Sequence, residues 1–418
     1  MLVPTSMIKS LIRERENTHQ KAIYEVSSKW GKEQTLTGPF ITIPYIRYIK
    51  QFSKKDSVEK IIKVKDYIHF LPSKLIVNGE INPERRYRGI YEIVVYNSVL
   101  NISGTFNKLT FTNFDIPLKD IQFDKATLSL GISDLRGIEN QVSLDWNSEL
   151  FTFNPGTVTN NLIASGINTN IPINSNDISS YKFLLNLDLK GSQKLYFIPV
   201  GEVSDVTINS KWNNPSFNGA FLPDSRTVKK SGFTANWNIL HLNRNFPQKW
   251  IGSINNINKS AFGIDLLLPV DSYQKSMRSI KYALLFIAFT FIVFFFVEIL
   301  RKVFIHPVQY ILVGIALIVF YTLLLSISEY LSYNLAFIIS AALTLLLIIG
   351  YVKAILKSNQ LTLLIGGILT VLYAFIFVII QLQDYALLIG SIGLFIILGL
   401  VMYFSRKIDW YSINLDEN

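Results

Sequence analysis

The last third of the chain contains five apolar stretches, each about as long as a helix that crosses a lipid bilayer. About 20 apolar residues in a helix span the roughly 30 Å of hydrocarbon. Helices are the expected spanning element because each one satisfies its own backbone hydrogen bonds in lipid. The short connections favour an up-and-down antiparallel arrangement. The stretches are 281–300, 307–327, 333–352, 361–381 and 385–404, and they predict a five-helix transmembrane bundle over 280–404.

The connections between these stretches indicate which side of the bundle faces the cytoplasm. Lys and Arg occur in every other connection, and the positive-inside rule places such connections in the cytoplasm. The tail, 405–418, is then cytoplasmic, and residues 34–279 lie on the opposite side of the membrane. The cationic connections contain Arg301 and Lys302, Lys353 and Lys357, and Arg406 and Lys407, whereas the others contain Glu329 and Asp384.

This topology makes a demand on the N-terminal end of the sequence. A large domain before the first stretch needs an upstream segment to carry it across the membrane, and residues 1–8 contain no complete signal sequence. We therefore interpret residues 1–8 as the remnant of an N-terminal transmembrane helix, which gives six spans with both ends inside. Residues 9–33 are predicted to continue as a helical stalk, which the Gly38-Pro39 pair follows.

Residues 34–279 change to a two-residue period that is typical of strands. Segments such as 75–81, 90–96, 99–106, 183–189 and 233–237 alternate apolar and polar residues between Gly, Asn, Asp and Pro breaks. Antiparallel sheets in a sandwich-like, mainly-β extracytoplasmic domain are the expected result. The sequence Lys190-Gly191-Ser192 predicts a hairpin turn between 183–189 and 194–199.

Composition excludes several classes of protein. The chain is 50% hydrophobic and 17% charged, against about 25% charged for soluble domains, so a single soluble globule is excluded. There is no cysteine, which excludes a disulfide-stapled domain. The net charge of +10 comes mostly from residues before 280, including clusters from Lys54-Lys55 to Lys65 and at Arg85, Arg86 and Arg88. On an extracytoplasmic domain, such clusters fit anionic headgroups or cell-wall polymers better than nucleic acid.

The sequence contains no recognisable catalytic or metal-binding motif. His19, His69, His241 and His306 are too far apart in the sequence for metal-ligand spacing, and neither a GxSxG, a P-loop nor a GxGxxG occurs. We therefore expect no catalytic residue, metal or cofactor. Two alternatives stay open. A transporter or lipid-handling protein requires an apolar groove that continues into the bundle, and a periplasmic hydrolase requires converging carboxylates or a His/Asp/Ser set.

A series of short motifs resembles the CreD family of inner-membrane proteins. They run in the family's order from about residue 8 to residue 360, whereas the last two spans match in hydropathy alone. They include Ile12-Arg13-Glu14-Arg15, Trp30-Gly31, Arg88-Gly89-Ile90-Tyr91, Phe197-Ile198-Pro199-Val200-Gly201, Trp212 with Pro215-Ser216-Phe217, Gly232-Phe233 with Trp237, Pro269-Val270-Asp271, His306-Pro307 with Gln309-Tyr310, and Ser328-Glu329.

The resemblance implies a bacterial inner-membrane protein with a large periplasmic domain and a C-terminal helical bundle. The family is linked to cell envelope integrity, colicin tolerance and the β-lactam response, and no catalytic activity is established for it. We therefore expect a non-enzymatic protein embedded in the lipid bilayer that binds an unknown periplasmic or membrane protein or an envelope polymer.

The motif-bearing stretches supply the candidate residues for this function. One group consists of candidate interaction residues in the β domain, and the alternative for it is that the glycines and prolines around these residues merely shape turns. The other group consists of polar residues at the membrane interface, and the alternative for it is a structural role, with Glu298 pairing to Arg301 or Lys302. The candidate interaction residues are Arg88, Tyr91, Trp212, Phe217 and Trp237, and the polar residues at the membrane interface are Glu298, His306, Gln309 and Glu329.

Overall fold

The structure is a computed structural model that describes residues 2–52, 59–111, 114–173, 180–253, 257–268, 272–382, 385–406 and 408. Lys54, Lys55, the Pro269-Val270-Asp271 motif, Asp384, Lys407 and the tail from 409 lie outside these residues. The chain divides into two compact units, one formed by residues 1–20 with 270–418 and the other by residues 21–269. Helix α1 (Leu2–Trp30) contributes its first part to one unit and its last part to the other.

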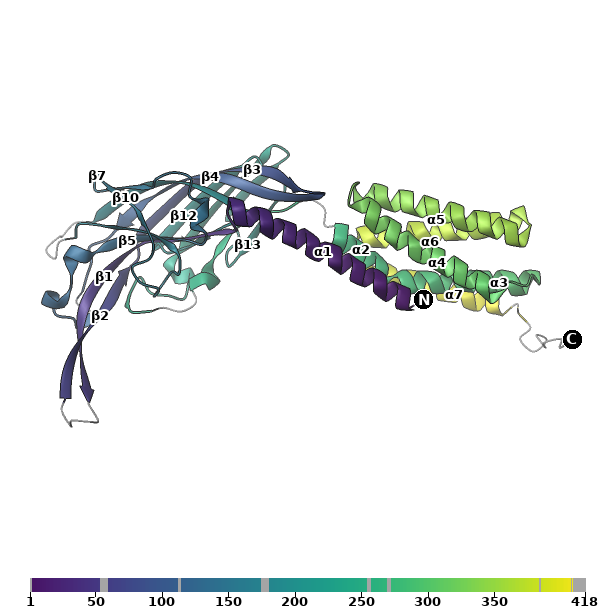
Figure 1. Ribbon diagram of the computed structural model, residues 1–418, viewed down its shortest axis with the longest axis horizontal. Helices are drawn as coiled ribbons and strands as arrows, with labels where there is room; N and C mark the ends of the chain where they lie inside the picture. The colour runs from purple at the N-terminus through teal and green to yellow at the C-terminus, as the bar shows by residue number, and fades with distance from the viewer. Residues whose placement is uncertain are drawn as a thin grey trace. The chain divides into compact units, whose positions relative to one another are not determined.

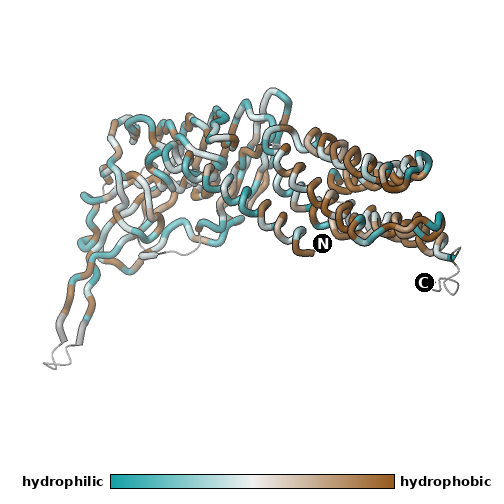
Figure 2. The backbone as a smooth tube through the Cα atoms, turned by 45° about the vertical axis from the view of Figure 1, so that its right-hand side comes forward, coloured by the Kyte–Doolittle hydropathy of each residue, from teal (hydrophilic) through white to brown (hydrophobic). Residues whose placement is uncertain are grey.

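The first unit is helical and carries the apolar stretches (Figure 1). Among the described residues, five of its helices are long and apolar enough to cross a membrane, and Figure 2 shows them mostly in the hydrophobic colour. Helix α4 packs on α5 and α5 packs on α6, while the short α2 contacts α4 and α6. The helices after α1 are α2 (Ser272–Lys281), α3 (Ala283–Arg301), α4 (Pro307–Ser328), α5 (Tyr333–Leu356), α6 (Asn359–Gln381) and α7 (Ala386–Ser405).

The second unit is built from two sheets. In the first sheet, the order is β13-β17-β11-β1-β5-β9-β8, with β2 on β1 and β16 on β2. Its strands are β1 (Gln34–Phe52), β2 (Glu59–Phe70), β5 (Thr127–Ile132), β8 (Asn154–Pro155), β9 (Gly166–Asn170), β11 (Lys194–Ile198), β13 (Pro215–Gly219), β16 (Lys249–Ile251) and β17 (Phe262–Leu266).

The second sheet has the order β14-β15-β12-β3-β4-β10-β6-β7. Its strands are β3 (Lys74–Arg88), β4 (Tyr91–Phe106), β6 (Ser143–Trp146), β7 (Glu149–Thr152), β10 (Tyr181–Ser192), β12 (Val203–Ser210), β14 (Ser225–Lys229) and β15 (Gly232–Leu240). Short 3₁₀ turns occur at Leu118–Asp120, Phe123–Lys125, Leu135–Gly137, His241–Asn243 and Ile257–Ser260.

The two sheets pack face to face around one hydrophobic core. Strands such as β10 and β15 alternate buried and half-buried or exposed residues, so each sheet turns one apolar face inward. The rings of Trp237 on β15 and Phe262 on β17 lie 5.5 Å apart and join the two sheets directly. The prediction of a membrane protein with a mainly-β domain and a helical bundle is confirmed, and its sheets are mixed rather than purely antiparallel, because β1 pairs with β11 and β3 with β12 in parallel.

The hairpin predicted around Lys190-Gly191-Ser192 is wrong. Strand β10 pairs with β4 and β6 in one sheet, whereas β11 pairs with β1 and β17 in the other. Between them Gln193 adopts a φ of 61°. The turn signal is real, but it marks a crossing from one sheet to the other.

Candidate functional site

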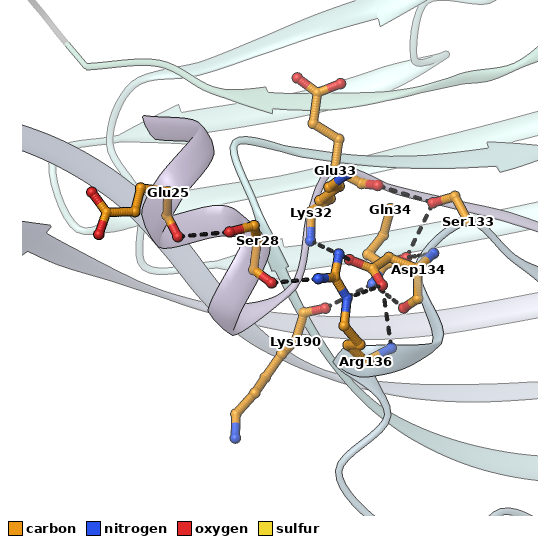
Figure 3. A network of polar contacts seen from close by, with 9 residues as sticks. All are labelled: Glu25, Ser28, Lys32, Glu33, Gln34, Ser133, Asp134, Arg136 and Lys190. Atoms are coloured by element: carbon orange, nitrogen blue, oxygen red, sulfur yellow. Dashed lines mark hydrogen bonds and ion pairs between the residues drawn. The ribbon is translucent and has the colours of Figure 1, made fainter. Parts of the chain in front are cut away.

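A network of polar contacts in the β unit lies where helix α1 ends and strand β1 begins (Figure 3). We call it the α1–β1 junction and define it by Ser28, Lys32, Gln34, Asp134 and Arg136. Asp134 is the N-cap of the 3₁₀ turn that follows β5, about a hundred residues from the helix end that it contacts. The junction therefore ties the end of α1 to the sandwich through residues that are distant in sequence.

Asp134 is the centre of this junction. Its carboxylate accepts hydrogen bonds from the Arg136 side chain at 2.8 and 2.9 Å and from the Lys32 backbone N–H at 3.0 Å. Arg136 also donates to the carbonyl of Ser28 in the last turn of α1. The hydrogen bonds from Arg136 lower the pKa of Asp134, which keeps this buried carboxyl ionised.

Gln34 completes the junction from inside. Its fully buried amide donates to the carbonyls of Asp134 and Lys190 at 2.9 and 3.0 Å, and its oxygen accepts from the backbone N–H of Asp134 at 3.1 Å. Gly137 is required here because a Cβ at this position would lie 2.2 Å from the Lys190 carbonyl oxygen. Every polar group of the Gln34 amide is thus engaged, which is typical of a structural joint.

Aromatic and charged side chains flank this junction on the helix. The ring of Trp30 has the guanidinium of Arg86 at 4.5 Å and the ammonium of Lys190 at 4.7 Å, and its indole N–H donates to the carbonyl of Tyr96. Such cation–π contacts stabilise an aromatic ring that lies at a surface. The predicted Arg cluster is therefore engaged within the domain: Arg85 pairs with Glu92, Arg86 with Glu84, and Arg88 with Glu25.

The five candidate interaction residues do not form one patch. Arg88 is exposed and pairs with Glu25 at 2.9 Å, and Tyr91 packs beside Ile93 and Ala22 in a small cluster under α1. The three aromatic candidates lie in the core of the sandwich: Trp212, Phe217 and Trp237 are 7%, 8% and 2% exposed. The rings of Phe217 and Trp237 are 5.9 Å apart. A role for them in binding stays a prediction, and from the core such a role is indirect.

Three of the four polar residues that were predicted to lie at the membrane interface organise the start of α4. The His306 ring accepts from the Val308 N–H at 3.3 Å, and the Gln309 side chain accepts from the His306 N–H at 3.1 Å, which together form a capping box. Glu298 accepts from the Tyr310 hydroxyl at 2.6 Å and the Ile305 N–H at 3.3 Å. These partners replace the predicted pairing of Glu298 with Arg301 or Lys302.

Glu329 joins three segments of the helical unit. It follows the end of α4, its side chain is 6% exposed, and it forms a two-pronged ion pair with Arg15 of α1. The hydroxyl of Tyr273 on α2 donates to the same carboxylate at 3.2 Å. Sequence reasoning singled out Glu329 but missed both partners, because no spacing rule relates positions 15, 273 and 329.

His69 is a fully buried titratable group of the sandwich, and its hydrogen-bond partners are uncharged. Its Nδ1 lies 3.0 Å from the Thr42 hydroxyl, its Nε2 lies 3.5 Å from the Asn161 amide, and its ring packs 5.2 Å from that of Trp250. Burial lowers the pKa of His69 to about 4. In the described part of the chain, no group of three or more His, Asp or Glu residues is placed to hold a metal ion.

This environment predicts a specific loss of stability in mild acid. Since the pKa of His69 is lower in the folded protein than the usual value of about 6.5, protons favour the unfolded chain. The contribution of His69 is complete above about pH 6.5 and is lost as the pH falls toward 4, at a cost of about 3 kcal/mol.

Thermal unfolding of the purified protein across this pH range, compared with a His69→Phe variant, checks this prediction. The difference between the two midpoints should shrink or reverse as the pH falls. Parallel curves for the two proteins contradict it.

Comparisons with known proteins agree with the motifs in the sequence. Residues 1–411 match the family described as inner membrane protein CreD. The chain is 32% identical over 422 residues to the inner membrane protein CreD of Escherichia coli (strain K12), covering 100% of this chain and 92% of that protein. A solved M1 zinc metallopeptidase from Deinococcus radiodurans shares 10% identity over 40% of this chain and 38% of its own. The TM-score of 0.19 is too low to indicate a shared fold. The match extends through the last two spans, and the chain belongs to the CreD family of inner membrane proteins.

Proposed function

We propose that this inner-membrane protein supports cell envelope integrity without catalysis, through a periplasmic β domain that binds an envelope partner. The observation that carries the proposal is the α1–β1 junction, where a polar network centred on Asp134 and Gln34 fastens the end of a helix to the sandwich. Saturated hydrogen bonds fix a structure in place, whereas a catalytic group needs a free donor, acceptor or lone pair that reaches a substrate.

The surroundings of the histidines in the β unit support the non-enzymatic part. His69 is 0% exposed and neutral at physiological pH, so it cannot reach a substrate in the periplasm. His241 lies in a 3₁₀ turn, where its backbone N–H donates to the carbonyl of Glu202. The two alternatives, a hydrolase and a lipid-handling protein, each need a built cleft, and the space between the two sheets is filled with side chains such as Trp146 and Phe262.

Disruption of the gene in its own host should make the envelope leak periplasmic enzymes and raise β-lactam sensitivity, and the full chain should restore both. A His241→Ala variant should restore them equally well, because the proposal assigns no chemistry to this side chain.

Since the chain has no cysteine, a Lys182→Cys variant labelled by a membrane-impermeant maleimide from the periplasmic side checks the orientation. An intact envelope without the gene, or a loss of rescue in His241→Ala at normal protein levels, would contradict the proposal.

A further inference from the structure

Strands β1 and β2 extend beyond the two sheets as a two-stranded arm (Figure 1). We define the arm by residues 46–50 of β1 and 61–65 of β2, which pair with each other in an unbroken antiparallel register. The register of β1 with β5 ends at Thr42, and that of β2 with β16 ends at Ile68. Among the described strands, none pairs with the outer edges of the arm, so these edges present backbone donors and acceptors in a strand conformation.

The two faces of the arm differ in chemistry. Residues directly opposite each other in an antiparallel pair share a face, so Tyr48 and Lys63 lie on one side and Ile49 and Ile62 on the other. The first face carries three ammonium groups, and the second carries three aliphatic side chains and one guanidinium. The first consists of Ile46, Tyr48, Lys50, Ile61, Lys63 and Lys65, and the second of Arg47, Ile49, Ile62 and Val64.

The arm differs from the core strands in two ways: several of its apolar side chains are exposed, and its charged residues are all cations. Tyr48, Ile49 and Ile61 are 50%, 38% and 63% exposed, although the chain buries most of its aliphatic side chains in this unit. The ten residues include four cations and no carboxylate. Acidic residues lie at both ends of the arm. At its base Asp66 is 3.6 Å from Arg47 and Asp120 accepts from the Tyr48 hydroxyl at 3.3 Å, and at the other end Glu59 of β2 pairs with Phe52 in the strand register.

We propose that this arm binds an extended acidic segment of a partner protein, which adds to it as a further strand. Unpaired strand edges recognise extended peptides through backbone hydrogen bonds, and alternate side chains give specificity. A segment that alternates acidic and apolar residues and pairs with the outer edge of β2 turns its carboxylates toward Lys63 and Lys65 and its apolar side chains toward Ile62 and Val64. The inference deepens the proposed function, since it rests on a partner for the β domain and names the chemistry of that partner.

An anionic membrane is the competing occupant for a cationic surface with exposed apolar groups. The unpaired backbone groups favour the peptide, because a lipid headgroup supplies no periodic ladder of donors and acceptors along a strand. The two occupants separate cleanly in a binding experiment, since a peptide can be varied in its alternation at constant charge.

The test uses the full chain in detergent micelles and a fluorescent peptide of about eight residues, a typical strand length, that alternates Glu and Val. Anisotropy should show saturable binding that weakens with added salt, because exposed charges are screened. A peptide of the same composition with Glu and Val in separate blocks should bind about tenfold more weakly or worse. The Lys63→Glu/Lys65→Glu variant should lose binding by a similar factor, with an unchanged unfolding midpoint.

The matched control is Lys182→Glu/Lys229→Glu, which makes the same charge change at exposed positions on β10 and β14 and should bind the alternating peptide normally. Equal binding of the two peptides, or full binding by Lys63→Glu/Lys65→Glu, overturns the proposal. So does binding of vesicles that contain anionic lipid through these two lysines in the absence of peptide binding. A failure here leaves the envelope role untouched, because that role is tested by gene disruption in cells.

Discussion

Replacing Arg15 by alanine is expected to destabilise the helical unit by about 3 kcal/mol, the usual cost of leaving a buried charge without its partner. The carboxylate of Glu329 is nearly buried, and it loses both prongs of its pairing with Arg15. The Tyr273 hydroxyl, at 3.2 Å, is a neutral donor that does not compensate a full charge.

A double-mutant cycle separates this pairing from the general effect of shortening a side chain. Glu329→Gln removes the charge and keeps the shape, so Arg15→Ala combined with Glu329→Gln should be more stable than Arg15→Ala alone. Reversing the pair as Arg15→Glu with Glu329→Arg should restore part of the stability that either reversal loses.

Thermal unfolding of the full chain in detergent supplies the measurement, and Arg13→Ala serves as the matched control. Arg13 is exposed on the same helix, two residues from Arg15, and its loss should change the midpoint little. Equal effects of Arg13→Ala and Arg15→Ala, or strictly additive effects of the Arg15 and Glu329 changes, would contradict a specific pairing.

The lengths of the apolar stretches predicted the helices well. In lipid, a single segment can satisfy its own backbone hydrogen bonds only as a helix. The predicted stretch 307–327 agrees closely with α4, which Pro307 and the His306 cap begin at the expected residue. Helix α5 is longer than predicted at its C-terminal end. The stretch 333–352 continues to Leu356, since Lys353 is tolerated near a helix end in lipid.

Contacts between residues that are distant in the sequence could not be predicted from it. The alternation in 183–189 correctly indicated a strand, but a period of two does not reveal which sheet a strand joins, and the turn after it was therefore misread. Glu298 was expected to find a cation one turn along its helix, whereas the chain reversal before α4 brings the Tyr310 hydroxyl to it. Trp237 was a candidate interaction residue because of its motif, and the structure buries it between the two sheets.

Asp134 shows the same limit within the candidate site. It is one of several carboxylates between predicted strands, and no residue near it in sequence announces that Lys32 and Gln34 lie beside it. The Arg two positions later was the available signal, since Asp-x-Arg allows a side-chain pair within one turn. The pair is important because it holds the end of α1 through Ser28 and Lys32. These residues come close to Asp134 and Arg136 only in the folded chain.

Replacing Asp134 by alanine is therefore expected to loosen the end of α1 from the sandwich, with a cost of about 3 kcal/mol for the charge-assisted hydrogen bonds that are lost. The Lys32 N–H loses its acceptor, and Arg136 loses the carboxylate that orients it toward the Ser28 carbonyl. Because the loss is local, hydrogen exchange measured by mass spectrometry on peptides that cover residues 21–36 is the sensitive readout.

Faster exchange should be confined to that segment and to residues 133–137, while the core strands β4 and β10 keep their protection. The control Glu149→Ala removes an exposed carboxylate from the β6–β7 hairpin and should leave exchange unchanged. Asp134→Asn distinguishes charge from shape, since its amide oxygen still accepts one hydrogen bond but no longer attracts the guanidinium of Arg136. Exchange in Asp134→Asn that is as fast as in Asp134→Ala places the stabilisation in the ion pair, whereas unchanged exchange in Asp134→Ala would show that Gln34 and Trp30 hold the helix end without it.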